Sequence, residues 1–286
     1  MRWLCIHGTG SSGAIFQDQL VPITSHLEQK GHTFEFINGP FTCKPAVGLS
    51  LRYPTGPYYT WWTESTSAAI RAACATLHTH FQTQTSSSGP YDGVVSFSRG
   101  CLLVSAYIHL HQATRPSQPL PFRTATFLCG GPSLSILSEL GLPISEKVRE
   151  WDRKTKVALR ERGSNESILK HGRDRWLIPG PNGDAELGLD PDAEIHRRNV
   201  YGLDTVSLPE GMRINIPTAH LVGRVDPRIP ASLWLIHLSE ENGREVFMHP
   251  GGHNIPRSEE SANRIAEMME RSVRIDSLSG SNHAPV

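Results

Sequence analysis

A serine with small residues two positions before and after it, an aspartate and a histidine occur in this 286-residue chain where together they could perform nucleophilic chemistry. Ser98 lies in "SFSRG", Asp226 in "LVGRVDP" and His253 in "MHPGGHNIP". A serine hydroxyl becomes a good nucleophile when a positioned histidine accepts its proton, and a carboxylate is needed to orient that histidine. These residue types therefore predict an acyl-transfer site with Ser98 as nucleophile, His253 as base and Asp226 as the orienting acid.

The segment around Ser98 has the character of a tight turn from a strand into a helix. The apolar run "DGVVSF" precedes the serine, and a helical pattern of apolar residues follows it. In such a turn, the residues two positions before and two positions after the nucleophile must be small. Gly100 meets this need, and Ser96 meets it approximately. A serine at this place could also be an ordinary cap or turn residue, so the other motifs decide.

The aspartate and the histidine each follow a predicted strand. Asp226 comes after "TAHLVG", and His253 lies in a glycine-rich loop after "REVFMH". The order serine, aspartate, histidine along the chain is that of α/β-hydrolases. Taken singly, Asp226 could be a helix cap or an ion-pair partner. His220 and His249 are rivals for the base, but both lie in a predicted strand, where a structural role is expected.

Backbone amides must stabilise the negative charge that develops on a substrate carbonyl oxygen. We expect one donor from Arg99, directly after the nucleophile, and a second from Thr9 or Gly10 in "HGTGSSG". This glycine-rich loop lacks the lysine of a phosphate-binding loop and the spacing of a dinucleotide-binding motif, so nucleotide binding is not favoured. We expect no metal and no organic cofactor.

Strand-like and helix-like runs alternate along most of the chain, which predicts one α/β domain with a mostly parallel sheet flanked by helices. The expected strands are residues 2–6, 32–38, 92–97, 124–131, 218–223 and 244–249. The stretch from about 131 to 210 breaks the alternation and is predicted to be an inserted cap or lid. Residues 276–286 are predicted to form a polar tail.

The overall charge is balanced, because 28 lysines and arginines face 28 acidic residues. We therefore expect neither nucleic acid nor a membrane surface as the main partner. No apolar run reaches the about 18 residues that a membrane span needs, and no signal-peptide pattern is present, so a cytoplasmic protein is expected. The five cysteines form no CxxC pair, and disulfides or a zinc site are not expected.

The motifs "WLCIHGTGSSG", "GPYYTWW", "YDGVVSFSRG", "HLVGRVDP" and "HPGGHNIP" together resemble the fungal-type serine hydrolase family, a branch of the α/β-hydrolase superfamily. The resemblance covers both ends and the middle of the chain but not residues 131–210. It implies an α/β-hydrolase fold, Ser98, Asp226 and His253 as catalytic residues, and hydrolysis of esters or thioesters. Ser96 and Arg99 depart from the G-F-S-Q-G turn that is usual in this family.

Two further segments could contact a substrate or a partner. Tyr58, Tyr59, Trp61 and Trp62 crowd residues 39–62 and predict either an apolar wall for an acyl chain or a small core under a long loop. Between residues 147 and 175, ten lysines and arginines face five acids. This basic stretch is either a solvated helix face or a docking surface for an acidic acyl carrier protein, which reversal of Arg153, Lys154 and Lys156 to glutamate tests.

Four functions agree with these motifs. The first is a thioesterase that releases a polyketide or fatty acyl chain from a carrier protein in secondary metabolism, as in fungal relatives that the sequence resembles. The second is a carboxylesterase acting on a small secondary metabolite. The third keeps the fold but forms, cyclises or cleaves carbon–carbon bonds, with the oxyanion donors stabilising an enolate. The fourth is a non-catalytic binding protein.

Overall fold

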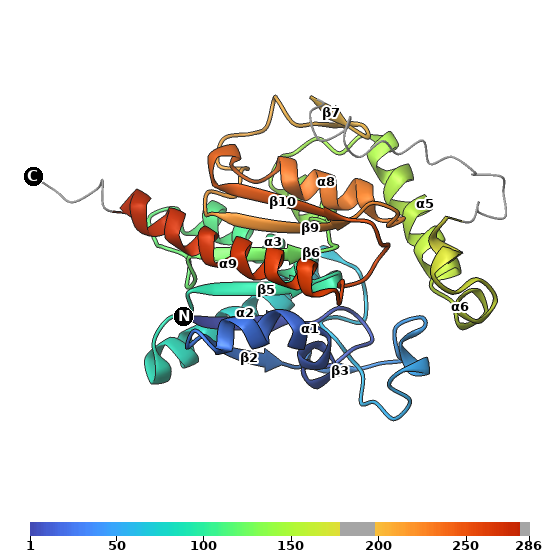
Figure 1. Ribbon diagram of the computed structural model, residues 1–286. Coiled ribbons are helices and arrows are strands. Elements are labelled where there is room, and N and C mark those ends of the chain that lie inside the picture. The colour runs from blue at the N-terminus through green and yellow to red at the C-terminus, as the bar shows by residue number, and fades with distance from the viewer. Residues whose placement is uncertain (178–197, 281–286) are drawn as a thin grey trace, which may run out of the picture.

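A central parallel sheet organises the molecule (Figure 1). The computed structural model describes residues 1–177 and 198–280, with side chains described up to residue 275. The sheet has the strand order β10-β9-β6-β5-β1-β2. Its strands are β1 (Arg2–Ile6), β2 (Thr33–Ile37), β5 (Gly93–Phe97), β6 (Thr124–Leu128), β9 (Thr218–Gly223) and β10 (Arg244–His249). All five strand pairings are parallel, as the sequence predicts.

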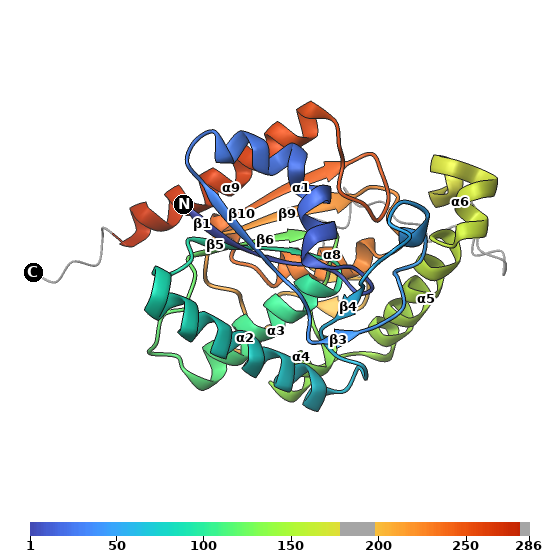
Figure 2. The same cartoon turned by 90° about the horizontal axis from the view of Figure 1, so that it is seen from below.

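Helices cover both faces of the sheet, which is why its inner strands are apolar along their whole length. Helices α1 (Gly13–Glu28) and α9 (Glu259–Gly280) lie side by side on one face (Figures 1 and 2). Helices α2 (Ser67–Ser88), α3 (Arg99–Thr114) and α8 (Ile229–His237) cover the other face. Polar side chains cap the N-termini of α1 and α2. The hydroxyl of Ser12 accepts a hydrogen bond from the Ile15 amide of α1, and that of Thr66 accepts one from the Ala69 amide of α2.

The predicted insertion lies between β6 and β9, and its first helix belongs to the body of the molecule. Helix α4 (Leu134–Glu139) packs against α3 and buries Ile136 in the main core. The helices that follow, α5 (Glu146–Arg162) and α6 (Asn165–His171), lie beyond the carboxyl ends of the strands and are termed the cap (Figures 1 and 2). A 3-10 helix (Gly172–Trp176) and a small hairpin of β7 (Asn199–Val200) and β8 (Leu203–Asp204) complete the described insertion. Its acid-rich part, with Asp184, Glu186, Asp190 and Asp192, lies outside the described residues.

The long aromatic segment is not entirely loop. Strands β3 (Phe41–Thr42) and β4 (Tyr59–Thr60) form a short antiparallel ladder, and a 3-10 helix (Leu49–Leu51) lies between them. At the other end of the chain, α9 continues to Gly280, so the first five residues of the expected polar tail are helical. Residues 281–286 lie outside the described part.

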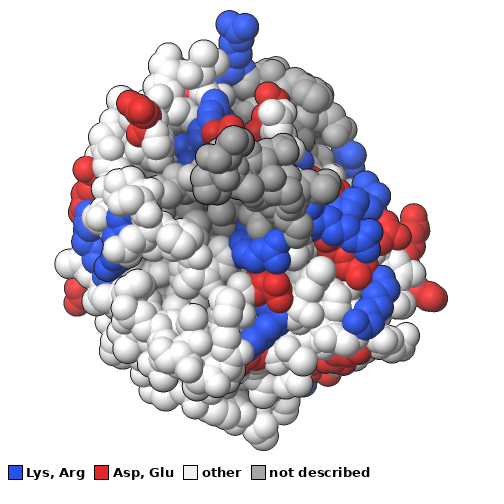
Figure 3. Space-filling view, turned by 90° about the vertical axis from the view of Figure 1, so that its left-hand side faces the viewer, with Lys and Arg blue, Asp and Glu red and all other residues white. Residues whose placement is uncertain are grey.

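The surface charges are mixed on the face seen in Figure 3, and the described helices are not of the membrane-spanning kind. On the face of the molecule away from the cap, basic and acidic residues are interspersed (Figure 3). Within residues 1–177 and 198–280, none of the helices combines the length and the apolar character that a membrane span requires.

Candidate active site

Ser98 stands in a strained turn between β5 and α3. Its backbone has φ 54° and ψ −115°, a region that a residue with a side chain rarely adopts. A side chain at Gly100 would lie 3.0 Å from the carbonyl oxygen of His7 and closer still to that of Ile6, so only glycine lets α3 start this near to β1. Ser96 is fully buried and its hydroxyl donates to the Thr126 carbonyl at 3.2 Å. The small polar residue at this position is therefore accommodated inside the sheet.

The structure brings Ser98, His253 and Asp226 together at the carboxyl ends of the strands. The distance from Ser98 Oγ to His253 Nε2 is 2.9 Å, and His253 Nδ1 lies 2.8 Å from Asp226 Oδ2. Asp226 is 1% exposed. When Nδ1–H donates to the carboxylate, Nε2 is left to accept the proton of the serine hydroxyl. The geometry is therefore that of a nucleophile, a base and an orienting acid.

Backbone hydrogen bonds hold the acid and the histidine loops against each other. The amide of Val225 donates to the Gly251 carbonyl at 3.2 Å. The second carboxylate oxygen of Asp226 accepts from the amide of Arg228 at 2.8 Å, which fixes the rotation of the carboxylate. The ring of Phe97 packs against the imidazole of His253, with 5.2 Å between the ring centres. Each functional side chain is thus held by a loop at the end of a different strand.

The rival histidines lie in settings that keep them neutral. His220 lies 3.0 Å from the Thr218 hydroxyl, and burial lowers its pKa to about 3. His249 accepts from the Gly251 amide at 3.2 Å, and burial lowers its pKa to about 4. It is His253 that lies within hydrogen-bond distance of Ser98. The structural roles expected for the two strand histidines agree with these contacts.

The loop after β1 is organised by His7. Its Nδ1 lies 2.6 Å from the Gly8 carbonyl, and its Nε2 accepts from the Gly39 amide at 3.0 Å. Burial lowers the pKa of His7, so the ring stays neutral and can donate through one nitrogen while it accepts through the other. His7 thereby shapes the loop that carries the two expected oxyanion donors. In the sequence this histidine stands out only as part of the motif "HGTGSSG", and nothing there indicates its role.

The two alternatives for the oxyanion donor of this loop, Thr9 and Gly10, are not equivalent. The Gly10 amide donates to the Tyr59 carbonyl at 2.9 Å, so the expectation that it serves the oxyanion is wrong for this conformation. Within the described part of the chain, the amide of Thr9 and that of Arg99 at the start of α3 have no backbone acceptor. Of the three expected donors, Thr9 and Arg99 therefore keep amides that could serve an oxyanion.

Comparison with known proteins assigns a family to the chain. The family described as "Serine hydrolase (FSH1)" matches residues 1–265, including the insertion that the motif resemblance leaves out. The chain belongs to this serine hydrolase family. It is 27% identical over 264 residues to "Esterase alnB" of Emericella nidulans, which covers 89% of this chain and 90% of that protein.

Other relatives of this serine hydrolase extend over nearly its whole length. It is 26% identical to "Hydrolase FUB4" of Fusarium oxysporum f. sp. lycopersici, covering 96% of this chain and 98% of the relative. It is also 26% identical to "Esterase mlcF" of Penicillium citrinum, covering 96% and 88%. The solved structure of a Paleococcus ferrophilus monoacylglycerol lipase superposes with a TM-score of 0.50 at 15% identity, covering 96% of this chain and 94% of that one. The fold is thus that of the α/β-hydrolases.

The aromatic segment of the serine hydrolase packs mainly in the protein core, where it contacts the loop after β1. Trp61 and Trp62 are 4% and 2% exposed and belong to the main core. The indole N–H of Trp61 donates to the His7 carbonyl at 2.8 Å. Tyr58 donates through its hydroxyl to the Tyr53 carbonyl, and the backbone of Tyr59 pairs with the loop after β1. Trp61 and Trp62 thus form part of a core under a loop, which was one of the two predicted alternatives. Contact of Tyr58, Tyr59, Trp61 and Trp62 with a substrate stays a prediction.

Two cap contacts reach the loops of the acid and the histidine, and no sequence pattern indicates them. The guanidinium of Arg228 donates to Asp152 Oδ1 at 2.8 Å and to Thr155 Oγ1 at 2.6 Å, both on α5. Trp176, at the end of the 3-10 helix, lies on Gly252, where an added side-chain carbon would be 2.5 Å from its ring. The cap is therefore attached next to both Asp226 and His253.

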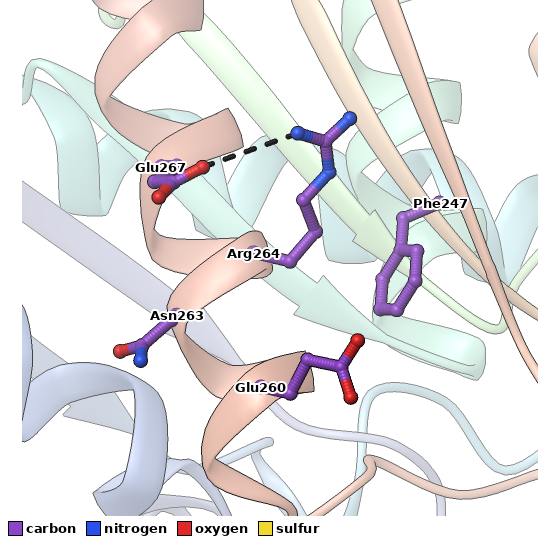
Figure 4. Close-up of a pocket in the computed structure, with 5 residues that line it drawn as sticks. All are labelled: Phe247, Glu260, Asn263, Arg264 and Glu267. Carbon is purple, nitrogen blue, oxygen red and sulfur yellow. Dashed lines mark ion pairs between the residues drawn. The ribbon is translucent and has the colours of Figure 1, made fainter.

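A surface hollow elsewhere in the molecule does not contain these groups. It lies between β10 and α9, has a volume of about 430 Å³, and is lined by Phe247, Glu260, Asn263, Arg264 and Glu267 (Figure 4). Arg264 and Glu267 pair with each other at 3.9 Å. None of its lining residues is one of the predicted site residues.

Proposed function

We propose that this serine hydrolase is an acyl hydrolase that works through an acyl-enzyme on Ser98, and that its substrate is a thioester of a polyketide or fatty acyl chain on a carrier protein. The observation that carries the proposal is the chain of short contacts from Ser98 through His253 to buried Asp226. The strained backbone of Ser98 adds to it, because such strain is typical of functional positions.

In the proposed reaction, Ser98 Oγ attacks the substrate carbonyl carbon while His253 Nε2 accepts the hydroxyl proton. The amides of Thr9 and Arg99 donate to the oxygen that becomes negative. Collapse of the tetrahedral intermediate breaks the carbon–sulfur bond, and His253 gives its proton to the leaving thiolate. A water molecule, deprotonated by His253, then releases the carboxylic acid and restores Ser98. Asp226 holds the imidazole in the required orientation throughout.

The first experiment is intact-mass measurement after exposure to a fluorophosphonate, which traps serines activated by a base and oxyanion donors. We expect one adduct on the wild type and none on Ser98→Ala. Turnover of acyl thioesters should fall by about 10⁴-fold or more in Ser98→Ala and His253→Ala, and the double variant should be no worse than either single one. Unchanged turnover in Ser98→Ala would refute the proposal and leave the non-hydrolytic or binding alternatives.

A carboxylesterase acting on a small secondary metabolite is the second candidate. It is favoured by relatives that carry the name esterase, such as alnB and mlcF. A matched panel of oxygen esters and thioesters of the same acyl groups separates the two candidates. A preference for the thioester in kcat/KM supports the carrier-linked function, and a preference for the ester supports the second.

The carrier protein would dock on helix α5, in our proposal. Arg149, Arg153, Lys156 and Arg160 are exposed and follow one another at spacings of four, three and four residues, so they share one face of the helix. Such a positive stripe suits an acidic carrier. Lys154 lies off this stripe and pairs with Glu150 at 2.9 Å.

Charge reversal tests this docking. We expect the double change Arg149→Glu and Arg153→Glu to lower kcat/KM for a carrier-bound acyl chain about tenfold, and to spare the same acyl group on N-acetylcysteamine. Lys154→Glu is the matched control on another face of the same helix. Equal effects on both substrates would contradict carrier docking.

A further inference from the structure

The arginine that follows the nucleophile has no acidic partner. The guanidinium of Arg99 lies over the ring of Trp62, 5.2 Å from its centre. Its Nη1 donates to the Thr60 hydroxyl at 3.0 Å and to the Trp62 carbonyl at 3.3 Å. Both acceptors are neutral. Among the described residues, no aspartate or glutamate lies within ion-pair distance of Arg99.

The guanidinium of Arg160, which belongs to α5, adds a second positive charge that acts on Arg99. Arg160 itself forms no ion pair within the described residues. Burial lowers the pKa of Arg99, because protein rather than water surrounds much of its charge. A positive charge that is partly removed from water and has no acidic partner is stabilised when an anion binds beside it.

A polar group beside Arg99 also lacks a partner. The indole N–H of Trp62, whose ring lies under the guanidinium, is buried and has no hydrogen-bond acceptor in the described structure. Buried polar groups are nearly always paired, so the surroundings of Arg99 are short of hydrogen-bond acceptors.

We infer that Arg99, with Arg160 adding to the positive charge, binds a carboxylate group that the substrate carries close to its reacting carbonyl. This inference rests on the proposed acyl hydrolysis. A guanidinium presents parallel N–H groups that match the two oxygens of a carboxylate. The phosphate of a pantetheine arm lies at the far end of the arm from the thioester, whereas Arg99 is the neighbour of Ser98, so the carboxylate belongs to the acyl group.

The test compares two acyl esters that differ only in charge. The p-nitrophenyl ester of glutarate carries a free carboxylate, and the p-nitrophenyl ester of monomethyl glutarate does not. We expect the ratio of their kcat/KM values, charged over neutral, to fall about 10- to 100-fold in Arg99→Gln, the range of a hydrogen bond to a charged group. Arg160→Gln should lower the ratio in the same direction. Arg264→Gln, an arginine of the hollow on α9, is the control and should leave it unchanged.

Equal losses on both esters would overturn the inference, because they would mean that Arg99 only holds the segment of Thr60 and Trp62 in place. A loss confined to coenzyme A thioesters relative to N-acetylcysteamine thioesters of one acyl group would overturn it too. Arg99 would then bind a phosphate of the leaving group.

Binding to the inactive protein separates this inference from the proposed function. On Ser98→Ala, calorimetry should show tighter binding of monomethyl glutarate, which keeps one free carboxylate, than of dimethyl glutarate. The preference should disappear in Ser98→Ala/Arg99→Gln, and its persistence there would refute the subsite. This measurement needs no turnover, so it stands even when Ser98→Ala shows that the proposed chemistry is wrong.

Discussion

Replacing Arg228 with alanine should loosen the cap and lower the stability of the whole protein. The guanidinium makes hydrogen bonds of 2.8 and 2.9 Å to Asp152 and one of 2.6 Å to Thr155. The Arg228 and Asp152 side chains are 13% and 21% exposed, so the pair is shielded from water to a large extent. Breaking a fully buried pair costs about 3–5 kcal/mol and a surface pair about 0–1 kcal/mol. Because Asp152 keeps Lys156 at 2.7 Å, we expect a loss of about 2–3 kcal/mol.

Urea unfolding of Arg228→Ala and of Lys154→Ala measures this loss against a control on the same helix. Lys154→Ala removes an exposed pair with Glu150 and should cost no more than about 0.5 kcal/mol. A double-mutant cycle of Arg228→Ala with Asp152→Asn should give a coupling of about 1 kcal/mol or more. Equal losses in the two single variants, or no coupling in the cycle, would refute the view that this contact anchors the cap.

Two further predictions follow from the turn at the nucleophile and from the buried histidines. Gly100→Ala should abolish turnover and destabilise the fold by about 1–3 kcal/mol, because the new carbon collides with the backbone of β1. The control Ser96→Gly only removes atoms and should stay active. Full activity of Gly100→Ala would contradict the argument that this position must be glycine. The second concerns acid: burial lowers the pKa of His109 to about 4, of His220 to about 3 and of His249 to about 4. The pKa of a histidine in the unfolded chain is about 6.5, so below this pH the unfolded chain binds protons that the native protein does not. The free energy of unfolding therefore does not vary with pH through these histidines above pH 6.5, and it decreases toward pH 4 by about 1.4 kcal/mol per pH unit for each of them. Urea unfolding between pH 7 and pH 4 measures how steeply the free energy of unfolding falls with pH. Replacing His220 with glutamine should lower this slope by the amount that corresponds to about one proton. An unchanged slope in that variant would contradict a neutral, buried His220.

The sheet could be predicted from the sequence because its inner strands are buried on both faces and its edge strands are partly buried. "TAHLVG" and "REVFMH" coincide with β9 and β10, since short apolar and β-branched runs between turn residues are typical of buried strands. Ser98, Asp226 and His253 were predictable for a related reason: each follows one of these strands, and the carboxyl ends of parallel strands meet at one edge.

Other parts of the site depend on contacts between distant segments and left no local pattern. The Gly10 amide could be expected to be free, but β4 places the Tyr59 carbonyl beside it. The aromatic content of residues 58–62 agreed equally well with a substrate wall and with the core that Trp61 and Trp62 enter. Trp176 reaches Gly252 only because the cap folds back over the strand ends. None of these contacts can be read from composition or periodicity.

The parallel topology also sets the order in which the protein can acquire reactivity. Ser98 and His253 are 155 positions apart, and the strands that precede Asp226 and His253 are the last two of the sheet along the chain. A growing chain that has completed β6 already contains Ser98 but neither Asp226 nor His253. Pairings between residues so distant in sequence form slowly. Covalent labelling of Ser98 during refolding would thus time the docking of β9 and β10, and a half-made chain would carry a serine no more reactive than any other.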